Sequence, residues 1–148
     1  MLKPLIQIDA KLPLPKAEFT RAIKAACKAV APHVSAQKDV MEVTIRLAEN
    51  EEVQALNKQF RGKDYATNVL SFPSEDEGYA GDIIIAVPVL VKEAETEGKP
   101  VLHHLQHLVI HGILHVHGFD HENEADAAEM EGLETILLAT LNIPNPYA

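Results

Sequence analysis

The feature that most constrains this chain is a series of regularly spaced histidines in its second half. Six of the eight histidines lie between His103 and His117, and a seventh is His121. His111 and His115 are four residues apart, so an α-helix places both imidazoles on one face, one turn apart. The spacing therefore predicts a helix through this segment with two imidazoles side by side near its end.

A glycine predicts where this helix stops. Gly118 accepts a positive φ and allows a sharp turn, which brings His121 back toward His111 and His115. Three neutral imidazole nitrogens at about 2.0–2.1 Å suit a tetrahedral Zn²⁺ with one open vertex, and an open zinc site activates water. The pattern predicts one zinc ion per chain, bound by His111, His115 and His121.

One position separates this pattern from that of zinc peptidases. The spacing H-x3-H-x2-G-x2-H equals that of the metzincin motif H-E-x-x-H-x-x-G-x-x-H, where Glu follows the first histidine as general base. Gly112 stands at that position here. Without the carboxylate, ordinary zinc peptidase chemistry loses its proton shuttle, so we do not expect a peptidase.

Two neighbours are candidates for support of these histidines. His107 lies one turn before His111 on the same helical side, and it either contacts a ligand or substrate group or belongs to a polar helix face. Asp120 either hydrogen-bonds a ligand histidine, as outer carboxylates often do, or caps the turn. The sequence leaves both alternatives open.

Hydrophobic periodicity predicts four strands and five helices. The expected strands are residues 5–8, 41–47, 68–72 and 82–87, of which 41–47 alternates as a half-buried strand does. The expected helices are residues 15–30, the segment between an Asn50 N-cap and Gly62, 88–97, 100–117, and the segment from an Asn123 cap to Leu141. Because strands and helices interleave, we expect an α/β or α+β arrangement with a small mixed sheet.

Composition bounds the function less tightly. The formal net charge of −9 argues, taken alone, against a nucleic-acid partner. Residues 1–74 hold 11 basic and 8 acidic side chains, whereas residues 75–148 hold 2 and 14. Either this asymmetry presents a basic face to a partner, or both halves are simply solvated surface.

The same composition suggests a cytoplasmic protein. The single cysteine, Cys27, excludes an internal disulfide and agrees with a reducing compartment. No apolar run approaches the roughly 18–20 residues that cross a bilayer, and polar residues interrupt the N-terminal segment. We expect no membrane association and, since no repeat or long linker is present, a single domain over residues 1–148.

Four segments resemble the YbeY family, the bacterial rRNA maturation factors. They are HLVIHGILHVHGFDH at residues 107–121, LNKQFRGKDYATNVLSFP at residues 56–73, GDIIIA at residues 81–86 and the tail AEMEGLETILLATL at residues 128–141. The resemblance implies an α+β fold and a zinc metalloprotein whose ligands match His111, His115 and His121. It also implies that Arg61 is the family's functional arginine. A guanidinium holds a phosphate bidentately, although an arginine near a helix C-terminus is also an ordinary surface residue.

The resemblance implies a hydrolase: a single-strand-specific, zinc-dependent endoribonuclease acting in 16S rRNA 3′-end maturation and ribosome quality control. Its partners are then rRNA, the small ribosomal subunit and associated proteins. The alternative is a ribosome-assembly factor that binds RNA or protein and has a weakly catalytic metal site. A third possibility is hydrolysis of another ester or amide by the same centre. We further expect Arg61 to face the same cleft as the histidines, because phosphodiester cleavage needs a second positive charge.

Overall fold

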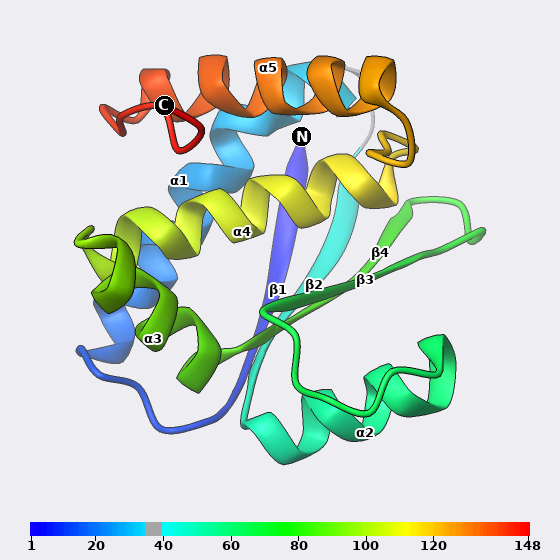
Figure 1. Cartoon of the computed structure of the whole chain (residues 1–148). Coiled ribbons are helices and arrows are strands. Elements are labelled where there is room, and N and C mark those ends of the chain that lie inside the picture. Colours follow the sequence, from blue (N-terminus) through cyan, green and yellow to red (C-terminus); the bar gives the residue numbers. More distant parts are fainter. Residues whose placement is uncertain (35–39) are drawn as a thin grey trace.

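The computed structural model describes residues 1–34 and 40–148. In these residues it contains the expected strands and helices, with bounds that differ by a few residues from those predicted (Figure 1). In chain order they are β1 (Leu2–Asp9), α1 (Lys16–Val34), β2 (Met41–Ala48), α2 (Asn50–Arg61), β3 (Val69–Pro73), β4 (Tyr79–Ala86), α3 (Val87–Glu97), α4 (Val101–Val116) and α5 (Glu124–Thr140).

The four strands form one mixed sheet in the order β1-β2-β4-β3. The pairs β1–β2 and β2–β4 are parallel, whereas β3 and β4 form an antiparallel hairpin. Helix α4 packs on β3 and β4 and also contacts α1, α3 and α5, so it lies at the centre of the helical layer (Figure 1). The fold is α+β with a small mixed sheet, as predicted.

Two apolar clusters cover the two faces of this sheet, because successive side chains of a strand point to opposite sides. The large core joins α1, α3, α4 and α5 to one face and includes Ile83 and Ile85 of β4. The small core lies on the other face under α2, and it consists of Ala48, Val53, Leu70, Ile84 and Ala86. Cys27 is buried in the large core, and this burial raises the pKa of its thiol to about 12.

The predicted N-cap of α2 is wrong. The N-cap of α2 is Glu49, which has extended backbone, and Asn50 is already helical. The Glu49 carboxylate accepts a hydrogen bond from the backbone N–H of Lys11 at 2.9 Å and does not cap α2. The predicted end is confirmed, because Gly62 adopts φ 69° and its N–H donates to the carbonyl of Lys58 at 3.1 Å.

Strand β4 begins three residues earlier than predicted, and Gly81 explains why the longer strand is possible. Gly81 pairs with Pro73 of β3 and adopts φ 147°. A Cβ atom at this position would lie 2.3 Å from the carbonyl oxygen of Phe72. The hairpin therefore closes here only because the residue has no side chain.

Among the described residues, no helix is both long and apolar enough to cross a membrane.

Candidate functional site

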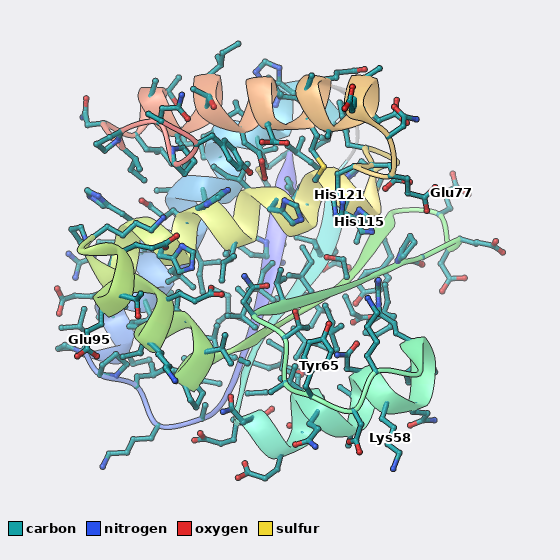
Figure 2. All side chains as sticks on the ribbon, viewed as in Figure 1. Lys58, Tyr65, Glu77, Glu95, His115 and His121 are labelled. Carbon is teal, nitrogen blue, oxygen red and sulfur yellow. The ribbon has the colours of Figure 1, made fainter. Side chains whose placement is uncertain are left out.

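The end of α4 brings together the three histidines that the spacing singled out. His111 and His115 project from consecutive turns of α4, with ring centroids 6.4 Å apart and planes 5° apart. Gly118 adopts φ 100° after the helix, as predicted, and the chain turns back. The His121 ring then lies 5.6 Å from the His111 ring and 6.0 Å from the His115 ring, centroid to centroid. Figure 2 shows His115 and His121 next to each other.

The triangle of rings is slightly wider than a closed coordination shell. With Zn–N bonds of about 2.0–2.1 Å, a tetrahedral ion would hold ring centres on the order of 5 Å apart. Within residues 1–34 and 40–148, no three His, Cys, Asp or Glu side chains are already arranged as a metal-binding group. Zinc binding by His111, His115 and His121 therefore stays a prediction.

The hydrogen bonds of two of these rings, those of His111 and His115, fit a metal site. Nδ1 of His111 lies 2.7 Å from Oε1 of Glu134, and Nδ1 of His115 lies 3.2 Å from the carbonyl oxygen of Phe119. Both partners are acceptors, so in the neutral rings Nδ1 carries the proton and Nε2 carries the lone pair. Metal-binding histidines typically donate their other N–H in this way, to a carboxylate or a carbonyl.

Glu134 is a fully buried carboxylate of α5 behind these rings. Burial by itself raises the pKa of Glu134. The opposite effect is larger, because Glu134 accepts hydrogen bonds from His107, His111 and Tyr147 and lies beside the charge of His111. The net result is a pKa lowered to about 2. Tyr147 donates to Oε2 at 2.5 Å. Nε2 of His107 lies 3.2 Å from the Tyr147 hydroxyl oxygen and 3.5 Å from Oε1 of Glu134. His107 thus lies beside Glu134, which bonds to His111, and beside Tyr147, which bonds to Glu134.

Asp120 holds the turn that carries His121. Its Oδ1 accepts a hydrogen bond from the backbone N–H of His121 at 2.7 Å. Burial and the charge of His111 lower the pKa of His115, whereas the negative charge of Asp120 opposes this shift. The lowered pKa keeps His115 neutral near pH 7, which is the form that binds a metal.

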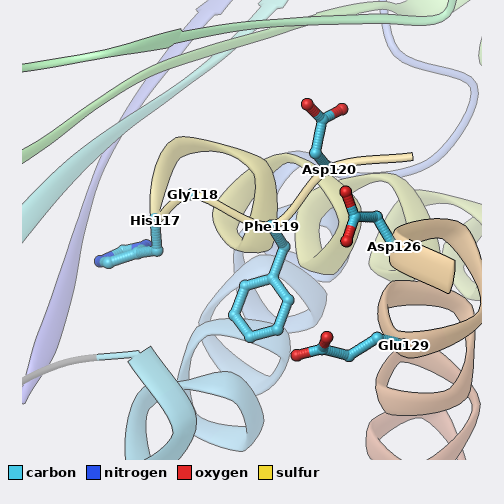
Figure 3. Close-up of a pocket in the computed structure, with 6 residues that line it drawn as sticks. All are labelled: His117, Gly118, Phe119, Asp120, Asp126 and Glu129. Atoms are coloured by element: carbon cyan, nitrogen blue, oxygen red, sulfur yellow. The ribbon is translucent and has the colours of Figure 1, made fainter. Parts of the chain in front are cut away.

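The hollow beside this turn is a separate feature. It is lined by His117, Gly118, Phe119, Asp120, Asp126 and Glu129, and none of the three clustered histidines takes part (Figure 3). The carboxylates of Asp120, Asp126 and Glu129 surround it, so it repels a phosphodiester. A nucleic-acid strand that reaches the histidines would approach from another side.

Arg61 lies at the C-terminal end of α2. Its Nη2 donates a hydrogen bond to the carbonyl of Ser71 in β3 at 3.2 Å. Although Arg61 and His115 are far apart in sequence, the guanidinium charge is one of the charges that lower the pKa of His115. The structure thus brings Arg61 within electrostatic range of the histidines, and its role toward a phosphate stays a prediction.

Sequence reasoning missed Glu134 and Tyr147. A signal for Glu134 was present, because it falls in the apolar stripe of α5 formed by Met130, Leu137 and Leu138, where a carboxylate is out of place unless it is paired. Tyr147 follows α5 by several residues and no periodic pattern includes it. Its contact depends on how the segment after α5 folds back.

Comparisons with known proteins agree with this architecture. The solution structure of TM1509 from Thermotoga maritima matches with a TM-score of 0.62 and 27% sequence identity, over 90% of this chain and 87% of that one. The fold is therefore one that a solved structure already shows, a mixed sheet layered with helices.

The sequence comparisons define the family. The model of the family described as Endoribonuclease YbeY matches residues 6–142. A protein of Aromatoleum aromaticum with the same description is 55% identical over 108 residues, which is 72% of this chain and 70% of the relative. Another, of Paraburkholderia phymatum, is 47% identical over 137 residues, 90% of this chain and 83% of the relative. The chain belongs to the YbeY family.

Proposed function

We propose that this chain is a zinc-dependent endoribonuclease that cleaves single-stranded RNA, acting in 16S rRNA 3′-end maturation and ribosome quality control. Its partners would be rRNA and the small ribosomal subunit with its associated proteins. Membership of a family described as endoribonucleases supports the activity. The observation that carries the metal dependence is the triangle of His111, His115 and His121, in which two rings hold their Nδ1 atoms on acceptors.

The three imidazoles would hold the ion through nitrogens that face away from Glu134 and Phe119. Zinc bound there supplies a Lewis acid and lowers the pKa of water to about 7. Glu134 and the Phe119 carbonyl keep the tautomers of His111 and His115 fixed, so neither ring has to reorient when RNA arrives. Because His111 and His115 would bind as neutral imidazoles, the ion would keep its full positive charge toward a phosphate.

Arg61 supplies the second positive charge that a phosphodiester transition state needs. Within the described part of the chain, the guanidinium makes this one hydrogen bond to the Ser71 carbonyl, so its other N–H groups remain for phosphate oxygens. Removal of such a preorganised donor typically costs about 10²–10³ in rate. Arg61 therefore binds and orients the phosphate in the proposed reaction, and it need not transfer a proton.

The peptidase alternative is weakened further by the position of Gly112. A Cβ atom there would lie 2.8 Å from Cγ2 of Ile83 in the large core. The residue after the first histidine thus points at β4, where a glutamate would not fit. A general base of the metzincin type is excluded from this position by packing as well as by sequence.

The second candidate is a ribosome-assembly factor whose metal site is weakly catalytic. The net charge of −9 and the acidic hollow favour it, because an acidic protein would rely on protein partners to reach RNA. The two functions differ in what the histidines do. In the endoribonuclease they are needed for cleavage, whereas in the binding factor their loss leaves the interaction with RNA or protein in place.

The test compares cleavage of single-stranded RNA by the wild type, His115→Ala and His33→Ala. His33 is an exposed residue near the end of α1 and serves as the matched control. We expect the wild type and His33→Ala to cleave, to lose cleavage with a chelator, and to regain it with Zn²⁺. His115→Ala should stay inactive and should bind less than one zinc per chain.

The outcomes separate the hypotheses. Equal cleavage by His115→Ala and wild type would contradict the metal-dependent mechanism and point to a contaminating nuclease. RNA binding without cleavage by either protein would favour the assembly factor. A fourth protein side chain in the zinc sphere would indicate a structural site and exclude the catalytic assignment.

A further inference from the structure

The segment that follows α5 folds back onto the histidines. Helix α5 ends at Thr140, and Asn142 then adopts φ 62°, which reverses the chain direction. Ile143 is buried in the large core and anchors the segment. The Asn145 side chain accepts hydrogen bonds from the Thr135 hydroxyl at 3.3 Å and from the Tyr147 backbone N–H at 2.8 Å. These contacts fix the direction in which the Tyr147 side chain extends from the backbone.

The Tyr147 hydroxyl reaches the buried carboxylate that holds His111. It donates to Oε2 of Glu134 at 2.5 Å, while Oε1 of the same carboxylate lies 2.7 Å from Nδ1 of His111. The hydroxyl oxygen also lies 3.2 Å from Nε2 of His107, whose ring is edge-to-face with that of Tyr147 at 5.6 Å. The carboxylate is thus held at both oxygens, one by imidazole and the other by phenol.

The two oxygens of Glu134 are not independent. The side chain is fully buried, so Oε2 has no water to replace a lost protein partner. Without the tyrosine hydroxyl, the carboxylate would rotate or bind a proton to satisfy Oε2. Either change weakens the bond from Oε1 to His111, and with it the tautomer and orientation of that ring.

We propose that Tyr147 is a positioning residue for the metal site: it fixes the Glu134 carboxylate, which in turn fixes His111 with Nε2 directed to the ion. This inference rests on the proposed metal-binding role of the histidines. It extends that role to a residue 36 positions after His111, which lies outside the residues matched by the family model.

The experiment uses Tyr147→Phe, which removes the hydroxyl and keeps the ring. Tyr65→Phe is the matched control, because Tyr65 is exposed and lies on the loop between α2 and β3, away from the histidines (Figure 2). The first measurement is the dissociation constant for Zn²⁺ with a competing chelator. We expect about tenfold weaker binding for Tyr147→Phe, the lower end of the effect of outer hydrogen-bond partners, and no change for Tyr65→Phe.

A double-mutant cycle with Glu134→Gln shows whether Tyr147 acts through the carboxylate. If it does, Tyr147→Phe weakens zinc binding in the wild-type background and has little further effect in Glu134→Gln. Additive losses in the cycle, or unchanged zinc affinity of Tyr147→Phe, would overturn the proposal. Unfolding of the metal-free variants by urea confirms that each is folded.

A second readout needs no metal and no RNA. Nitrogen-15 spectra of the imidazoles at about pH 8, above the ordinary histidine pKa, report the tautomer of His111. We expect one tautomer, protonated at Nδ1, in the metal-free wild type and a mixture in Tyr147→Phe. An unchanged single tautomer in the variant would overturn the positioning role even if the wild type bound no zinc, a result that would separately contradict the proposed function.

Discussion

The two faces of the sheet carry different amounts of core, and each carries one part of the candidate site. On the large-core face, His111 and His115 extend from a helix surrounded by other helices, and their Nδ1 atoms bond to partly or fully buried acceptors. On the small-core face, Arg61 stands at the exposed end of α2 with one hydrogen bond to a backbone carbonyl. The proposed metal binding would need the rigid support that the first face gives, whereas the hydrogen bond to Ser71 fixes the Arg61 guanidinium at the edge of the sheet, toward the proposed phosphate.

The largest expected loss of stability comes from a Leu→Ala substitution, made once in the core of each face. Leu105 in α4 and Leu70 in β3 are both buried, the first in the large core and the second in the small core. Leu→Ala costs about 2–5 kcal/mol, and the cost rises when the surroundings cannot collapse into the cavity. We expect Leu105→Ala near the upper end and Leu70→Ala near the lower end, measured by urea unfolding. Equal losses would contradict the difference between the faces.

The next largest effect is a loss of folding stability in acid, which comes from Glu134 on the large-core face. The folded protein lowers the pKa of Glu134 from 4.5 to about 2, so the folded state favours the ionised carboxylate more than the unfolded chain does. Ionised Glu134 therefore stabilises the folded state above about pH 4.5. This contribution, at most roughly 3 kcal/mol, is lost as the pH falls from about 4.5 to 2. Urea unfolding of the metal-free protein across this range should show the loss. Glu134→Gln should lack that step, and an identical pH dependence of the two proteins would contradict the assignment.

A smaller effect on stability is expected from a substitution that tests how tightly α4 packs on the sheet, with a glycine of α5 as the control. Gly112→Ala places a methyl group 2.8 Å from Ile83, so overpacking of about 1–3 kcal/mol should outweigh the gain in helix propensity of up to about 1 kcal/mol. At Gly132 in α5, an added Cβ would meet no atom of the described residues within 4 Å, so Gly132→Ala should stabilise instead. Thermal unfolding gives the two signs. A more stable Gly112→Ala protein would show that the large core tolerates a wider helix–sheet spacing.

The smallest effect on stability is expected on the small-core face, at Arg61. Arg61→Glu removes one hydrogen bond, worth about 0.5–1.5 kcal/mol, and should change the melting temperature by only a few degrees. It should nevertheless abolish RNA cleavage and leave the zinc content unchanged. Arg21→Glu, an exposed residue of α1, is the control for the charge reversal. Normal cleavage by Arg61→Glu would remove Arg61 from the mechanism and favour the binding factor.

Sequence alone predicts those parts of the fold that depend on local periodicity. The alternation in β2 and the four-residue spacing of His111 and His115 follow from the geometry of one element, and the structure has both. The N-cap of α2 was misplaced by one residue, because Glu49 and Asn50 both precede the apolar face and only backbone geometry separates them. Helix ends are the least determined part of such a prediction.

The contacts of Glu134 and Tyr147 with the histidines could not be predicted, for a different reason. The bond from His111 to Glu134 exists only because α5 packs across α4, and Tyr147 reaches Glu134 only after Asn142 reverses the chain. Neither contact follows from spacing within one helix. Asp120 shows the same limit, since both of its predicted roles fit the sequence and the structure shows a bond to the His121 backbone.

The hydrogen bond from Arg61 also occupies a backbone carbonyl at the edge of the sheet. Strand β3 is an edge strand of five residues. Because Asn68 and Ser74 bond across to β4, alternation directs the backbone groups of Val69, Ser71 and Pro73 away from the sheet. Proline has no N–H to offer, and Arg61 occupies the carbonyl of Ser71. A strand of another molecule would therefore find two of these pairing groups missing or occupied, so the arginine that we propose binds phosphate would also disfavour pairing at this edge.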